Sequence, residues 1–252
     1  MSKKNLIKKK LDYLFQKLKI CKGDNVLIHS NSAGILQFEN KKDNLNSLFT
    51  TLKKKVGTKG TIVIPTYNWS ILKKKIVNWK EMPSEVGLLS NILLRSGKFS
   101  RTRNPVYSHI VNGNLKKDLL NSNNQVAFKN DNNFFQKIID YKFKILGFCC
   151  PLNKMTLLHY IECLSNVPYR FEKKFYIKEK NKNKLILYKY FVGKKKIDYK
   201  LKDKNIRNLL FNKKKVKFVN FGKFESWIVN SDKVNLEVLK KFKKNKFFLI
   251  SK

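Results

Sequence analysis

Acidic residues are scarce in this sequence. Its 252 residues include 17 Asp and Glu against 56 Lys and Arg, which gives a formal charge of +39 at pH 7. A charge of this size is typical of proteins that bind nucleic acid or anionic membranes. Arginine, whose forked guanidinium suits base recognition, is nevertheless rare. The arginines are Arg95, Arg101, Arg103, Arg170 and Arg207.

The lysine excess has a simpler explanation than a nucleic-acid partner. Alanine occurs only at Ala33 and Ala127, while Lys, Asn, Ile and Phe are abundant, as drift toward A/T-rich codons would produce. The lysine runs are also scattered along the chain and do not form one stripe. They lie at 8–10, 53–55, 73–75, 194–196 and 213–215. We therefore expect solvated faces and no specific nucleic-acid partner.

Cysteine and histidine are also rare, which excludes some kinds of site. The three histidines do not cluster, and the four cysteines show no C-x-x-C spacing, so we expect reduced packing thiols and no metal site. No apolar run approaches the roughly 18 residues of a membrane span. The basic start is not followed by the apolar stretch of a signal peptide. We therefore expect a cytoplasmic protein with no membrane span.

The apolar residues, 42% of the chain, predict an α/β protein. Helical spacing predicts an amphipathic helix over 2–20, and short apolar runs predict strands over 26–28, 61–64, 106–111 and 143–148. Helices are expected at 45–56, after 84 with Ser84 as the N-cap, and at 155–164. No linker divides the chain, so we expect a single domain over 1–252.

The last third has a different pattern, which allows a C-terminal subdomain over about 171–252. Aromatic residues alternate with lysines over 171–191, which predicts extended hairpin segments. A short helix at 206–211, a strand at 216–219, and a final helix and strand ending at 248–250 are expected to follow.

His159 is the histidine with the most informative neighbours. Glu162 follows at i+3, on the same face of the expected helix, where its carboxylate can orient the ring and stabilise its charged form. That pair suits a general base, although surface His-x-x-Glu pairs are common. His29 and His109 stand beside expected strand ends, where α/β sheets bind ligands, and a structural role suits them equally well.

Five motifs follow one another along the chain. Residues 23–30 are GDNVLIHS, residues 57–69 are GTKGTIVIPTYNW, residues 82–87 are MPSEVG, residues 101–108 are RTRNPVYS, and residues 146–170 contain LG, MTLLHYIE and VPYR. In this order they resemble the motifs of the aminoglycoside 3-N-acetyltransferase family, with a looser match near 222–250. The main motifs span residues 23–170.

The resemblance implies a three-layer α/β/α sandwich around a mixed sheet and an enzyme that uses acetyl-CoA as co-substrate. It implies a catalytic pair of His159 and Glu162. Coenzyme A contacts are expected from His29, Ser30, Asn31, Thr66, Tyr67 and Ser108, and acceptor contacts from Glu85, Asn104 and His109. The chain departs from the family at Asn104, where the family has a histidine, and over 128–134, where the usual G-x-x-S-P is replaced.

The sequence therefore predicts an acetyl-CoA-dependent N-acetyltransferase that acts on an amino sugar or an aminoglycoside-like amine, by direct transfer with His159 as the base. Since a polycationic drug requires carboxylates, the acid-poor composition favours an anionic or neutral amino sugar. A homodimer is compatible with the sequence. The alternative is a degenerate family member that binds nucleic acid or membrane through its basic surface.

Overall fold

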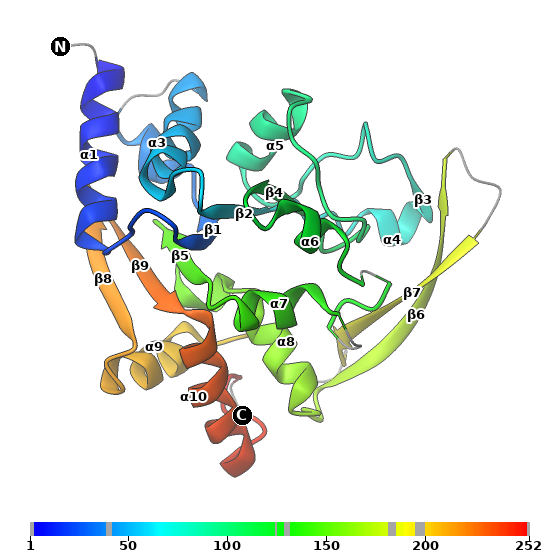
Figure 1. Cartoon of the computed structure of the whole chain (residues 1–252). Helices are drawn as coiled ribbons and strands as arrows, with labels where there is room; N and C mark the ends of the chain where they lie inside the picture. Colours follow the sequence, from blue (N-terminus) through cyan, green and yellow to red (C-terminus); the bar gives the residue numbers. More distant parts are fainter. Residues whose placement is uncertain are drawn as a thin grey trace.

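A mixed six-stranded sheet forms the centre of the protein in the computed structural model (Figure 1), which describes residues 3–38, 42–123, 125–128, 132–180, 185–194 and 200–250. The strand order is β4-β2-β1-β5-β9-β8. Strand β1 is parallel to β2 and β5, and the other pairings are antiparallel. The strands are β1 (Asn25–Ser30), β2 (Thr61–Pro65), β4 (His109–Gly113), β5 (Lys144–Phe148), β8 (Val216–Phe221) and β9 (Phe224–Asn230).

Alternating side chains of the sheet enter two separate cores. Val26 and Ile28 of β1 belong to one cluster and Leu27 belongs to the other. The first face is covered by α1 (Lys3–Lys17), α3 (Asn46–Val56) and α5 (Leu88–Arg95). The opposite face is covered by α7 (Phe134–Asp140), α8 (Leu157–Leu164), α9 (Asp203–Asn212) and α10 (Ser231–Lys244). The predicted three-layer α/β/α sandwich is confirmed.

A smaller three-stranded sheet stands beside this sandwich. It consists of β3 (Ile76–Val77), β6 (Arg170–Glu179) and β7 (Leu185–Gly193), and its β6–β7 hairpin extends on the side of the molecule away from α1 (Figure 1). The remaining short helices are α2 (Ala33–Leu36), α4 (Ile71–Lys74), α6 (Lys116–Leu120) and the 3₁₀ turns Lys42–Leu45 and Leu152–Lys154. Residues after 170 thus divide between two sheets, because β8 and β9 join β5 in the large one.

Three local predictions are wrong, each for a local reason. Ser84 does not cap a helix, because its hydroxyl bonds Val86 and α5 begins only after Gly87, which turns the chain at a φ of 84°. The strand expected over 106–111 begins at His109, because Asn104 Oδ1 binds the two N–H groups that follow it and bends the chain. No strand forms at 248–250, where Ile250 makes only an isolated bridge.

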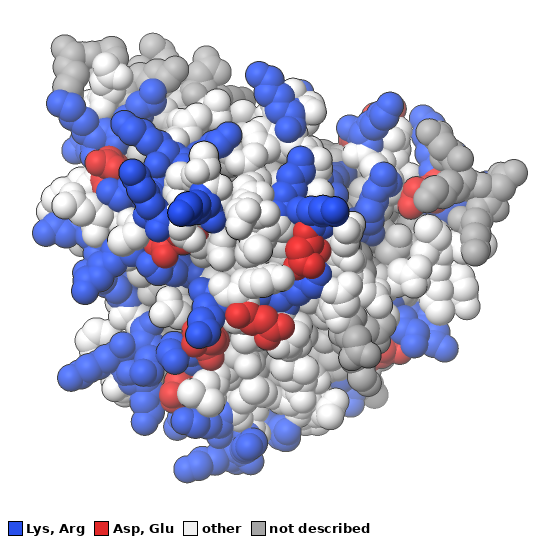
Figure 2. All heavy atoms as spheres, viewed as in Figure 1, with Lys and Arg blue, Asp and Glu red and all other residues white. Residues whose placement is uncertain are grey.

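Basic side chains are spread over the surface. In the face shown in Figure 2, Lys and Arg occur over most of the visible area with acidic side chains between them, and they do not gather over a single element. Within the described residues no helix is long and apolar enough to cross a membrane.

Gly147 of β5 lies against the buried Trp227 of β9, and a Cβ at this position would overlap the indole. The indole cannot withdraw easily, because its Nε1 donates to the Cys150 carbonyl at 2.6 Å. We expect Gly147→Ala to lower the free energy of unfolding by about 1–3 kcal/mol in urea titrations, the usual cost of overpacking. Adding Trp227→Leu should cost less than the sum of the two single changes. If Gly147→Ala left the free energy of unfolding unchanged, strands β5 and β9 would be able to move apart and accommodate the added methyl group without cost.

Candidate active site

A cleft of about 880 Å³ opens at the carboxyl ends of β1, β2 and β5. These three strands are parallel, and the ends of parallel strands are where α/β sheets usually bind ligands. Loops after β1 and β2, the segment after β5 and the start of α8 form the walls. Its polar and aromatic lining includes His29, Ser30, Asn31, Tyr67, Trp69, Tyr107, Asn153, Thr156, His159 and Arg170.

His159 stands at this cleft with its ring partly exposed, and its Nδ1 lies 2.7 Å from Glu162 Oε2. Glu162 is fully buried, accepts a hydrogen bond from the Tyr169 hydroxyl at 2.8 Å, and forms an ion pair with Arg170, whose Nε lies 2.8 Å from Oε2. A buried carboxylate with these partners is stable without solvent and holds the ring in one orientation. Because Nδ1 faces Glu162, Nε2 is the ring nitrogen left for a ligand.

His29 is the penultimate residue of β1, where it pairs with Gly147 of β5, and it also lines the cleft. Burial lowers the pKa of its imidazole to about 4, so the ring is neutral at physiological pH. Its Nε2 is buried and has no hydrogen-bond partner among the residues that the structure describes. A buried unpaired nitrogen costs stability unless a ligand satisfies it.

Thr66 and Ser108 do not reach the cleft. Their hydroxyls lie 2.9 Å apart, both residues are fully buried, and Ser108 Oγ also donates to the Thr66 carbonyl. They connect the end of β2 to the start of β4 behind the cleft wall. The structure therefore gives them a supporting position, whereas the sequence analysis expected contact with coenzyme A.

Asn104 and His109 also lie behind the wall. Asn104 Oδ1 accepts from the N–H groups of Val106 and Tyr107, at 3.0 and 2.7 Å. His109 is fully buried, stacks on Phe134, and lies 2.9 Å by its Nε2 from the Tyr67 hydroxyl. Asn104 thus fixes the backbone of Tyr107 and His109 fixes the side chain of Tyr67, two residues that line the cleft, whereas Asn104 and His109 do not line it.

Glu85 is exposed and lies outside the cleft lining. Its carboxylate accepts from the backbone N–H groups of Trp69 and Ser70, both at 3.0 Å, at the start of α4. Although desolvation opposes it, these hydrogen bonds hold the pKa of Glu85 below its usual range. Glu85 therefore fixes the position of the Trp69 backbone.

The family of the protein can be read from its sequence. A family model described as aminoglycoside 3-N-acetyltransferase matches residues 27–242. The chain belongs to the aminoglycoside 3-N-acetyltransferase family. It is accordingly an acetyl-CoA-dependent N-acetyltransferase, as the sequence analysis predicted. A search of the curated proteins found no match.

Solved acetyltransferase structures share this fold at low sequence identity. The apoenzyme of AAC(3)-IVa has a TM-score of 0.78 and 17% identity, over 97% of this chain and 91% of that one. AAC-IIIb in a binary complex with CoASH has a TM-score of 0.77 and 15% identity, over 94% and 96% of the two chains. The YokD protein from Bacillus subtilis has a TM-score of 0.74 and 17% identity, over 94% and 93%.

The structure brings to the cleft residues that the sequence analysis left without a role. Tyr169 and Arg170 contact the buried Glu162, by a hydrogen bond and an ion pair, and Trp69 and Tyr107 add aromatic walls. The signal for the first two was present, because both stand in the VPYR segment of the last motif. In the altered segment 128–134, Phe128 is buried with its ring 6.3 Å from His159, while 129–131 lie outside the described residues.

The two cysteines that follow β5, Cys149 and Cys150, are poor nucleophiles. Burial, reinforced by the neighbouring Cys149, raises the pKa of the Cys150 thiol to about 12, although this residue lines the cleft. Burial likewise raises the pKa of Cys149 to about 11. Both thiols therefore stay protonated near neutral pH. No group of three His, Cys, Asp or Glu residues in the described parts of the chain could hold a metal ion.

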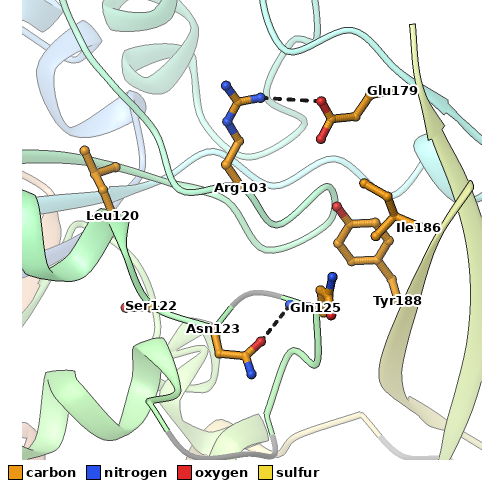
Figure 3. Close-up of a pocket in the computed structure, with 8 residues that line it drawn as sticks. All are labelled: Arg103, Leu120, Ser122, Asn123, Gln125, Glu179, Ile186 and Tyr188. Carbon is orange, nitrogen blue, oxygen red and sulfur yellow. Dashed lines mark hydrogen bonds and ion pairs between the residues drawn. The ribbon is translucent and has the colours of Figure 1, made fainter. Parts of the chain in front are cut away.

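A second hollow, of about 510 Å³, lies between β7 and the loops that precede it in the sequence. Figure 3 shows Arg103 and Glu179 facing each other across it, 3.8 Å apart, with Ile186 and Tyr188 of β7 alongside. Among the described residues it is lined by no histidine or cysteine, and its carboxylate, Glu179, is paired with Arg103.

Proposed function

We propose that this protein transfers an acetyl group directly from acetyl-CoA to the amine of an amino sugar or aminoglycoside-like acceptor, with His159 as the general base. The observation that carries the proposal is the His159 ring at the cleft, with Nδ1 bound to the buried Glu162. When Nδ1–H donates to Glu162, Nε2 carries the lone pair that can accept a proton. Family membership supports the same reaction.

The reaction needs a base because an ammonium has no lone pair. In the proposed step the amine nitrogen forms a bond to the thioester carbon, the carbon–sulfur bond breaks, and the amine proton moves to His159 Nε2. His159 then returns that proton to the departing thiolate, which leaves as the free thiol of coenzyme A. Glu162 stabilises the imidazolium while it carries the proton, and Arg170 and Tyr169 keep Glu162 in place.

Negative charge collects on the thioester oxygen during this step. His29 is suited to donate to it, since its ring is neutral, lines the cleft and has a buried Nε2 without a partner among the described residues. Ser30 and Asn31 continue this wall and are suited to contact acetyl-CoA. Thr66, Ser108 and Tyr67 would then act by fixing the shape of the wall.

Direct transfer fits the site better than an acyl-enzyme. Cys150 is the thiol at the cleft, and a pKa of about 12 leaves very little thiolate near neutral pH. An acyl-enzyme would also require His159 to activate this thiol, whereas Cys150 Sγ is directed to the His29 carbonyl at 3.6 Å.

We expect the full-length protein to bind acetyl-CoA and to release coenzyme A thiol when an amino sugar is added. A ligand that binds only the folded state raises the melting temperature. At a ligand concentration a hundred times Kd, it adds about 2.7 kcal/mol to the free energy of unfolding. The measurements are a thermal shift with acetyl-CoA and a thiol-release assay against amino sugars and aminoglycosides. Desulfo-coenzyme A should give the thermal shift without thiol release. No shift at millimolar acetyl-CoA would contradict the proposal.

A further inference from the structure

We propose that the acceptor is an anionic amino sugar and that the cleft rejects polycationic aminoglycosides. The inference rests on the proposed function and concerns the charge of the molecule that His159 would deprotonate. It follows from the charges that line the cleft.

The cleft presents cations and no described carboxylate. Lys154, Arg170 and Lys200 line it, and none of its described lining residues is Asp or Glu. Lys154 and Lys200 are exposed, at the turn after β5 and beyond β7. A polycation in this space would therefore face like charge, which disfavours binding.

Three carboxylates of the surrounding elements already have partners within the protein. Glu162 is fully buried, contacts His159 and the Tyr169 hydroxyl, and is ion-paired with Arg170. Asp203 accepts from the Asn153 N–H at 3.1 Å, and Glu85 caps α4. None of these three lines the cleft, so an aminoglycoside ammonium would lack the partner that a desolvated charge requires.

The electrostatic field of the whole protein is positive, as is the charge of the residues that line the cleft. With a formal charge of +39, the protein attracts anions and repels cations during diffusional approach, and this effect weakens as salt is added. Trp69, 43% exposed and packed edge-on against Tyr67, offers an apolar face for the sugar ring at the same cleft. A sugar that carries a phosphate could thus pair with Lys154 and pack against the aromatic wall.

The test compares three acceptors with the full-length enzyme at low salt: glucosamine, glucosamine 6-phosphate and kanamycin A. The first two differ only in the phosphate. We expect kcat/KM for glucosamine 6-phosphate to exceed that of glucosamine about tenfold or more and that of kanamycin A by a larger factor, with both ratios shrinking in high salt. A higher kcat/KM for kanamycin A than for glucosamine 6-phosphate would overturn the inference and leave the proposed function standing.

Reversing the charge of one lysine at the cleft tests whether the preference for the anionic acceptor arises there. Lys154→Glu should reduce the advantage of glucosamine 6-phosphate over glucosamine about tenfold, whereas Lys243→Glu, an exposed change of equal charge on α10, should leave it unchanged. Equal effects of the two substitutions would assign the preference to net charge and overturn the role of the cleft.

Acetyl-CoA is itself anionic, so its contacts must be separated from those of the acceptor. S-acetylpantetheine, which has no phosphate, serves as the second donor. If Lys154→Glu reduces the preference for glucosamine 6-phosphate with this donor as well, Lys154 contacts the acceptor. If the preference falls only with acetyl-CoA, the assignment of Lys154 to the acceptor is overturned. If no acceptor is acetylated, calorimetry on the coenzyme A complex still tests the charge preference. Binding of glucosamine 6-phosphate but not of kanamycin A would support the inference, although the proposed transfer reaction would have failed. Binding of kanamycin A but not of glucosamine 6-phosphate would overturn the inference.

Discussion

Replacing His159 with alanine should lower kcat by about 10²- to 10⁴-fold and leave the dissociation constant of acetyl-CoA nearly unchanged. Without the imidazole no positioned group removes the amine proton, which costs roughly 3–5 kcal/mol at the transition state. The ring contacts Glu162 and Arg170 by its Nδ1 side, so the substitution removes a side chain at the cleft and leaves the buried carboxylate its hydrogen bond from Tyr169 and its ion pair with Arg170. The measurement is thiol release at saturating acceptor.

Two controls separate catalysis from folding. His159→Gln keeps a polar side chain of similar size and should be as slow as the alanine variant, because an amide cannot accept the proton. Added imidazole should restore part of the rate in His159→Ala and leave the unchanged enzyme unaffected. A folded His159→Ala protein with an undiminished kcat would contradict the assignment, and His29, which also lines the cleft, would be the next residue to test.

The contact between His159 and Glu162 was predictable because its geometry is local. An i, i+3 spacing on one helix brings His159 and Glu162 together whatever the rest of the chain does, and the structure has them 2.7 Å apart. Tyr169 and Arg170 reach the same carboxylate from the segment that follows α8, and no periodicity indicates the direction of that turn. Only the motif indicated that this segment belongs to the site.

Hydroxyl groups at strand ends were harder to interpret. The family resemblance led us to expect that Thr66 and Ser108, beside β2 and β4, contact coenzyme A. The antiparallel pairing of these strands instead brings the two hydroxyls within 2.9 Å, so they satisfy each other. Sequence reveals that a residue is polar, but its partner depends on a strand pairing more than forty residues apart.

Long-range pairing also limited the prediction of the strands from the sequence. The apolar runs of β1, β2 and β5 are short, continuous and flanked by turns, and all three were predicted. Strand β9 was missed because its residues, FESWIVN, begin with polar and mixed positions and resemble a loop. It is stabilised by pairing with β5, about 80 residues earlier, where Trp227 lies on Gly147. Long-range pairing of this kind overrides local propensity.

Glu162→Ala should lower the free energy of unfolding by about 3–5 kcal/mol, because it leaves the nearly buried guanidinium of Arg170 without its carboxylate. The Tyr169 hydroxyl loses its acceptor at the same time. For a chain of this size the loss corresponds to a fall in Tm of roughly 6 to 20 °C. The measurement is thermal and urea unfolding followed by circular dichroism, beside acetyl transfer at a temperature where the variant is folded.

Two further substitutions test whether the unpaired charge of Arg170 causes the loss of stability in Glu162→Ala. Glu162→Gln keeps the shape and can still accept from Tyr169, so it should cost less stability than alanine, yet it should slow kcat because an amide stabilises the imidazolium poorly. In the double variant Glu162→Met/Arg170→Met both charges are replaced by apolar side chains, and stability should recover much of the loss while catalysis stays impaired. If the double variant were as unstable as Glu162→Ala, the loss would come from packing around α8, and the ion pair would contribute little to the fold. Recovery of stability without activity would show that the Glu162–Arg170 pair contributes to catalysis separately from its contribution to folding.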